Sequence, residues 1–176
     1  MTISIREERP SDYKDIECVI EQAFRHAEHT DHQEHKLVEK IRETDAYQPD
    51  LTFVAVDDER IVGHIVLSKI IIKNNNGRAD SLALAPVSVL PDYQGRGIGS
   101  QLIQHALSKA TETDHESVIV LGHEAYYPKF GFTRASEWQI TAPFDVPDES
   151  FMAIELRPNA LQHVHGIVHY SRAFNE

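Results

Sequence analysis

Three glycines at alternate positions, Gly95, Gly97 and Gly99, most constrain how this chain can fold. They stand between an apolar, β-rich segment that ends at Pro91 and an apolar helical pattern that begins at Ile98. Without Cβ atoms, the main chain can turn tightly and leave the first amides of the helix open. The positive end of the helix dipole points to the same place. This order of elements predicts a site for an anion such as a diphosphate.

Two other phosphate-binding motifs do not match. The P-loop needs a Gly-Lys-Ser/Thr sequence, and no lysine stands in this turn. The dinucleotide fingerprint needs G-x-G-x-x-G early in a βαβ unit, whereas the spacing here is G-x-G-x-G in the middle of the chain. Taken alone, the glycines leave one structural alternative open, a turn that only connects a strand to a helix.

Hydrophobic periodicity predicts a mixed sheet of about six or seven strands with helices on both faces, an α+β fold of three layers. Asp57 to Arg60 is a turn sequence that predicts a hairpin of residues 51–56 and 61–72, and Asn74 to Gly77 is a second strong turn signal before the next strand. The expected strands cover residues 3–7, 51–56, 61–72, 79–90, 118–121 and 151–156, with a last strand or an ordered tail over 166–170. The expected helices cover 13–24 with Ser11 as the cap, a shorter stretch around 37–44, 98–110 and 124–129.

Composition narrows the classes of partner. The chain has 176 residues, which we expect to form a single domain over 1–176. Its net charge of -11 disfavours nucleic acid and anionic membranes as partners. The charged N-terminal residues do not resemble a secretory signal, and a single cysteine excludes an internal disulfide. We therefore expect a cytoplasmic protein, with Cys18 buried beside Val19.

Two motifs together resemble a known family. Gln94, Gly97 and Gly99 follow a Val-x-Val-Leu-Pro strand and match a Gln/Arg-x-x-Gly-x-Gly/Ala signature. Downstream, Tyr127, Gly131 and Phe132 match a Tyr-x-x-x-Gly-Phe segment. Both motifs, and the helix and strand between them, resemble the GCN5-related N-acetyltransferases (GNAT), in particular a little-characterised bacterial subgroup. The resemblance implies the GNAT fold, with a sheet splayed between the strands that end near Leu90 and Leu121.

The resemblance also implies an enzyme, an acetyl-CoA-dependent N-acetyltransferase that moves the acetyl group to a primary amine by direct attack. The acceptor would be a small-molecule or peptide amine, and homodimers are common among relatives. Two alternatives stay open. One is a non-catalytic module that binds or senses acyl-CoA, and the other is an N-acyltransferase that uses a different acyl-CoA.

Site residues follow from the same resemblance. Tyr127 would be the general acid for the departing thiolate, with Tyr126 as a less favoured substitute. Glu124 is the tentative base, with Asp80, His123 and bulk solvent as alternatives, and the Val89 amide would be the oxyanion donor. The expected cofactor-binding residues are Val87, Ser88, Val89, Gln94, Gly95, Arg96, Gly97, Ile98, Gly99 and Ser100.

Four histidines recur every three residues, at His26, His29, His32 and His35. On a helix this spacing drifts around the axis, so the four rings cannot converge on one ion. Acidic residues also interleave with them. We therefore expect no metal site, and we expect this stretch to border the acceptor instead.

Overall fold

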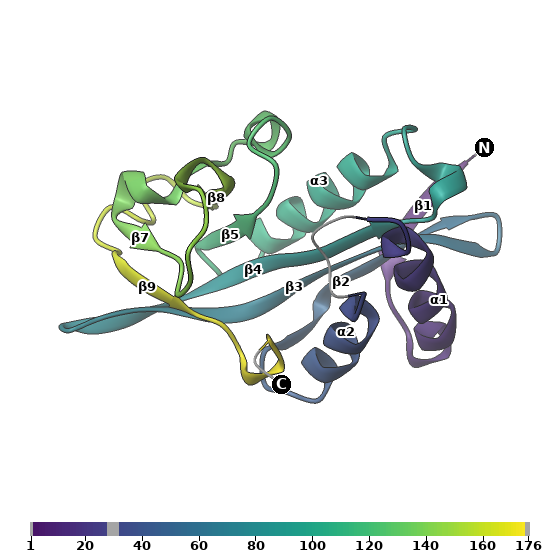
Figure 1. Cartoon of the computed structure of the whole chain (residues 1–176), viewed down its shortest axis with the longest axis horizontal. Coiled ribbons are helices and arrows are strands. Elements are labelled where there is room, and N and C mark those ends of the chain that lie inside the picture. The colour runs from purple at the N-terminus through teal and green to yellow at the C-terminus, as the bar shows by residue number, and fades with distance from the viewer. Residues whose placement is uncertain (1, 28–31, 175–176) are drawn as a thin grey trace.

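The computed structural model describes residues 2–27 and 32–174, and its first half forms four antiparallel strands, with two helices between the first and the second (Figure 1). These strands are β1 (Ile3–Glu7), β2 (Tyr47–Asp57), β3 (Arg60–Asn74) and β4 (Gly77–Val89). Asp58 takes a positive φ of 54° in the turn between β2 and β3. Gly77 pairs with Asn74 where β3 turns into β4. The predicted hairpin and the second predicted turn are confirmed, because short polar turns and glycine bring each strand back beside the previous one.

The second half extends the sheet beyond β4. Strand β5 (Ser117–Leu121) pairs with β4 in parallel, and β8 (Phe151–Glu155) and β6 (Thr133–Arg134) follow it in antiparallel order. Strand β9 (Gly166–His169) pairs with the outer half of β3 and with β7 (Ile140–Thr141). The mixed sheet is confirmed. It has nine strands in the described residues, because β6 and β7 add two-residue pairings that are too short to show periodicity.

Helices cover both faces of the sheet, as predicted. Figure 1 shows α3 (Ile98–Thr111) on one face and α1 (Tyr13–Phe24) and α2 (Glu34–Arg42) on the other. The buried residues of α1 are Ile16, Val19 and Ile20, which lie at helical spacing. Gly63 on β3 lets α3 approach closely, since a Cβ there would lie 3.0 Å from a Leu102 methyl. No helix in the described residues is long and apolar enough to cross a membrane.

Three local details differ from the sequence predictions. Ser11 lies inside a 3-10 turn (Pro10–Asp12), and α1 begins after it without a side-chain cap. The short helix expected over 124–129 is a 3-10 turn at Tyr127–Phe130, which Gly131 ends in the left-handed region. Cys18 is exposed. It precedes the buried Val19 by one position, and one step of about 100° is enough to turn a helical side chain away from the core.

A polar cluster centres on buried Glu8, directly after β1, and joins it to α2, β2 and β3. The Glu8 carboxylate accepts two hydrogen bonds from Arg42, one from the Tyr47 hydroxyl at 2.6 Å and one from His64 Nε2 at 2.9 Å. Burial lowers the pKa of His64, so the neutral ring donates from Nε2 and leaves Nδ1 buried without a partner. Burial alone would raise the pKa of Glu8, but its hydrogen bonds outweigh burial and lower the pKa to about 2. Glu8 and Arg42 therefore form a buried ion pair.

We expect Glu8→Gln to lower the free energy of unfolding by roughly 3 kcal/mol at pH 7, because it leaves the Arg42 charge buried without its partner. Urea denaturation measures this change, with exposed Glu59→Gln as the control. The Glu8 pKa lies below its ordinary value, so its contribution is complete above about pH 4.5 and is lost as pH falls towards about 2. A Glu8→Gln cost no larger than that of Glu59→Gln would contradict this account.

Candidate active site

The site begins where β4 and β5 separate. The two strands pair at only two positions, Leu82 with Val118 and Ala83 with Ile119. A bulge follows in β4, where Ala85 and Pro86 together stand opposite the single residue Val66 of β3. Such bulges bend a strand and end its pairing with a neighbour. Beyond Ala83, therefore, β4 and β5 diverge as the resemblance implied.

The last residues of β4 keep one edge open. Val87, Ser88 and Val89 pair with β3 on one side, and no strand in the described residues pairs with them on the other. The Val89 carbonyl accepts a hydrogen bond from Gln94 Nε2 at 3.0 Å, so it points away from β3. In a strand, the N–H and C=O of one residue face the same edge, and residues two apart share that edge. The main-chain groups of Val87 and Val89 therefore both face the open edge.

The turn over residues 95–99, called the glycine turn below, has main-chain amides that donate no hydrogen bond within the described residues. Gly95 and Gly97 have φ values of 78° and 82°, in the left-handed region that favours glycine. Within the described ranges, the amides of Gly95, Gly97, Ile98, Gly99 and Ser100 donate no hydrogen bond. A Cβ placed on Gly95 or Gly97 would meet nothing within 4 Å, so no side chain fills the space beside them. The turn thus has free donors beside open space, which is the requirement for a bound diphosphate.

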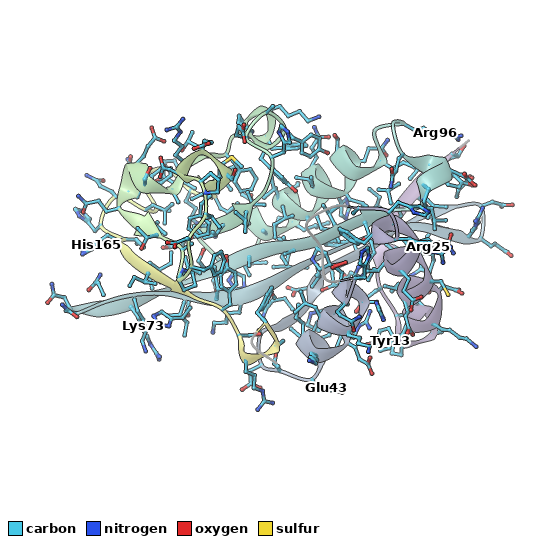
Figure 2. The ribbon with its side chains drawn as sticks, viewed as in Figure 1. Tyr13, Arg25, Glu43, Lys73, Arg96 and His165 are labelled. Carbon is cyan, nitrogen blue, oxygen red and sulfur yellow. The ribbon has the colours of Figure 1, made fainter. Side chains whose placement is uncertain are left out.

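Side chains around the turn hold its shape. Gln94 is tied back to β4 by the hydrogen bond to Val89, and the Tyr93 hydroxyl donates to Asp57 at 2.8 Å. The Arg96 guanidinium lies 5.3 Å from the centre of the Tyr93 ring. Figure 2 shows Arg96 at the edge of the molecule near the start of α3. Ile98 is buried, so its part in the site is limited to its amide.

The two tyrosines of the downstream motif have different surroundings. The Tyr126 hydroxyl lies 3.0 Å from Ser100 Oγ, which connects the 3-10 turn to the first turn of α3. Tyr127 is 8% exposed and packs against Phe130, Phe132 and the Tyr126 ring. Burial raises the pKa of Tyr127 to about 12. Its hydroxyl therefore keeps its proton at neutral pH, as a general acid must. The sequence did not predict the contact between Tyr126 and Ser100, which are 26 positions apart.

None of the candidate bases is held in a buried site. Glu124 is exposed. His123 Nδ1 accepts a hydrogen bond from the Ala125 amide at 3.1 Å and so stabilises the turn after β5. Asp80 lies 3.6 Å from Lys69 Nζ on the surface. The base thus stays the least supported of the predicted roles.

A cavity of about 390 Å³ opens where β4 and β5 separate. Residues 83–85 of β4, Ile119 and Leu121 of β5 and residues 168–170 form part of its wall. Phe144 and Phe174 complete its aromatic side. Sequence reasoning did not assign this cavity, because its walls come from segments that are far apart in the chain. Phe144 lies between the short strand β7 and β8 and is 48% exposed.

The histidine-rich stretch falls partly outside the described residues, which omit His29. His26 and His32 are exposed, and His35 Nε2 lies 3.5 Å from Glu21 Oε1. Glu17, Glu21 and His35 bring ligand atoms within 4.8 Å of one another. Both carboxylates lie on an exposed helix face, where acidic groups commonly occur without an ion, so we assign no metal to them.

Comparisons with known proteins identify the family. A profile described as the acetyltransferase (GNAT) family matches residues 17–132. The chain belongs to the GNAT family. It is 30% identical to the uncharacterised N-acetyltransferase YhbS of Escherichia coli over 97% of this chain and 98% of that protein. It is 33% identical to a second uncharacterised N-acetyltransferase of that organism, YjhQ, over 79% of this chain and 75% of the relative.

Solved GNAT structures give the same assignment. The crystal structure of YhbS from Escherichia coli in complex with CoA has a TM-score of 0.88 at 28% identity, covering 99% of this chain and 92% of that one. A GNAT acetyltransferase from Brucella melitensis in complex with acetyl-CoA has a TM-score of 0.81 at 31% identity, with 98% of each chain covered. This GNAT protein is therefore an acyltransferase, an N-acetyltransferase whose co-substrate is acetyl-CoA.

A substitution at Gly122 can test where the Tyr127 ring lies, because the two residues are in close contact. A Cβ at this position would lie well inside van der Waals contact with Tyr127 Cε2 and 2.9 Å from Cδ2. We expect Gly122→Ala to displace the Tyr127 ring and lower the free energy of unfolding by about 1 to 3 kcal/mol. In a Tyr127→Ala background the same substitution should cost much less, as urea denaturation of the four proteins would show. Equal costs in the two backgrounds would contradict the packing described for Tyr127.

Proposed function

We propose that the protein acetylates a primary amine of a small molecule or peptide by direct attack of the amine on the acetyl-CoA thioester. The observation that carries this proposal is the row of open amides at Gly95, Gly97, Ile98, Gly99 and Ser100, beside the free edge of β4. The amides would hold the diphosphate, and Arg96 would add a cation. Val87, Ser88 and Val89 would hold the pantetheine arm, with Val87 and Val89 supplying main-chain hydrogen bonds.

The reaction balances without a covalent enzyme intermediate. Acetyl-CoA supplies the acetyl group as a thioester. The amine nitrogen forms a bond to the acyl carbon while the carbon–sulfur bond breaks and its electron pair leaves with sulfur. The Val89 amide, which faces the open edge of β4, would stabilise the negative charge on the thioester oxygen. The proton lost by nitrogen would go to Glu124 or to solvent. Glu124 is exposed, so water can also reach the nitrogen from that side and take the proton.

Tyr127 would serve the leaving sulfur mainly as a hydrogen-bond donor. A thiol has an ordinary pKa near ~8.5, well below the value of about 12 to which burial raises the pKa of Tyr127. Full transfer of the tyrosine proton to the thiolate is therefore uphill, whereas a hydrogen bond to it is favourable. Tyr127 lies next in the chain to Tyr126, whose hydroxyl contacts the first turn of α3.

We also propose that residues 1–176 work as a single domain, since the buried apolar residues form two clusters that both pack on strands of the same sheet. A reducing, cytoplasmic location fits the one cysteine, which is exposed and unpaired. The acidic net charge of -11 supports neither a nucleic acid nor an anionic membrane as partner. A homodimer stays a prediction from the family.

The diphosphate site can be tested with a matched pair at Gly97. Asn and Asp both tolerate the left-handed backbone and have the same shape, but only Asp carries a negative charge. We expect Gly97→Asp to bind coenzyme A at least tenfold more weakly than Gly97→Asn, because the carboxylate would repel the diphosphate. Isothermal titration calorimetry measures both affinities, and circular dichroism checks the fold. Equal affinities for the two folded variants would remove the diphosphate from this turn.

The role of Tyr127 can be tested by Tyr127→Phe, which keeps the ring and removes the hydroxyl. We expect kcat to fall by about tenfold or more while the affinity for coenzyme A changes less than twofold. Tyr126→Phe tests the less favoured donor, whose hydroxyl lies 3.0 Å from Ser100 Oγ, and a larger loss of kcat in Tyr126→Phe than in Tyr127→Phe would assign the role to Tyr126. Thiol release from acetyl-CoA measures turnover. An unchanged kcat for Tyr127→Phe would exclude Tyr127 from the mechanism.

A further inference from the structure

Among the described residues, none that lines the cavity between β4 and β5 carries a carboxylate. Within the described residues, its only titratable lining groups are His169 and Tyr170, and its other lining residues are apolar. Burial raises the pKa of Tyr170 to about 12, so this side chain is neutral at physiological pH. Among the described lining residues, a polycationic acceptor would find no carboxylate to replace the water around its additional ammonium groups. The cavity is therefore suited to a molecule with one amine and an apolar remainder, despite the net charge of -11.

Aromatic rings form one side of the cavity. The Phe144 and Tyr170 rings are stacked, with centroids 6.1 Å apart and planes 16° apart. Phe174 approaches Tyr170 at a centroid distance of 5.0 Å. Phe144 is 48% exposed, and Leu121 on the facing strand is 45% exposed. Large apolar side chains exposed together around a cavity gain free energy when a ligand covers them.

The size of the cavity fits a ring with a short linker. Ala83 and Ala85 contribute small side chains to the wall, which helps to leave a volume of about 390 Å³. An apolar cavity of roughly 150 Å³ can hold benzene, so this one has room for a ring, a short chain and an amine. The cavity opens at the divergence of β4 and β5, next to the proposed position of the thioester. An amine attached to a ring in the cavity could thus reach the acyl carbon.

Resting on the proposed function, we propose that the acceptor is an aromatic amine of the arylalkyl type, whose ring packs against the stacked pair of Phe144 and Tyr170 and against Leu121. The nitrogen attacks the thioester carbon, sulfur leaves with the electron pair of the broken bond, and the surplus proton of nitrogen passes to solvent. The apolar wall also assists the chemistry, because desolvation disfavours the ammonium form and raises the fraction of neutral amine.

Direct binding provides a test that does not depend on turnover. Phenethylamine and ethylamine are titrated into the full-length protein saturated with coenzyme A, and calorimetry gives both dissociation constants. We expect phenethylamine to bind at least tenfold more tightly, and Phe144→Ala to remove most of that difference. Ile167→Ala is the matched control, because Ile167 is also 48% exposed, lies on the same strand as His169 and does not line the cavity. Equal affinity for the two amines would overturn the proposal.

Turnover separates this proposal from its alternatives. With acetyl-CoA, we expect kcat/KM for phenethylamine to exceed that for ethylamine and for spermidine by at least tenfold, and to fall about tenfold in Phe144→Ala. If Phe144→Ala instead impairs only the use of octanoyl-CoA, the cavity holds the acyl chain and the proposal is wrong. If phenethylamine binds but no amine is acetylated, the proposed function fails while the aromatic binding site stands.

Discussion

The two-position pairing of β4 with β5 is the constraint on which the rest of the site depends. A full parallel ladder would have used the outer edge of Val87 and Val89 and closed the space between the strands. The bulge at Ala85 and Pro86 instead ends the pairing after Ala83. One free edge and one cavity result from this separation. The open amides of the glycine turn follow directly after the free edge. Acetyl-CoA, which is long and partly charged, can therefore be held at several points along one strand and one helix.

Turn sequences and the spacing of apolar residues predicted the turns and the helix α3, which depend on residues close together in the chain. The turn after Asp57 predicted the first hairpin, Asn74 to Gly77 predicted a second turn, and the glycines at 95, 97 and 99 predicted a turn at the start of a helix. Apolar spacing located α3 to within one residue at each end. These predictions succeed because turn chemistry and helical periodicity act over a few residues, without help from tertiary contacts.

Features that depend on distant residues were not predictable from one sequence. The contacts of Glu8 with Arg42 and His64 join positions 34 and 56 residues apart. The cavity joins Ala83, Ile119, Phe144 and Phe174, and no local pattern connects them. Strands β6 and β7 have two residues each, fewer than any periodicity needs. In each case the order of strands in the sheet decides which side chains meet. The sequence predicted a mixed sheet but not that order.

The most direct test of this account follows the amide signals of residues 95–100 by ¹H–¹⁵N NMR during titration with coenzyme A and with pantetheine. The two ligands share the pantetheine arm, but only coenzyme A carries the diphosphate. The account predicts that coenzyme A shifts the Gly95, Gly97 and Gly99 amides strongly, whereas pantetheine leaves them nearly unchanged. Binding of coenzyme A without a shift at these amides would contradict it.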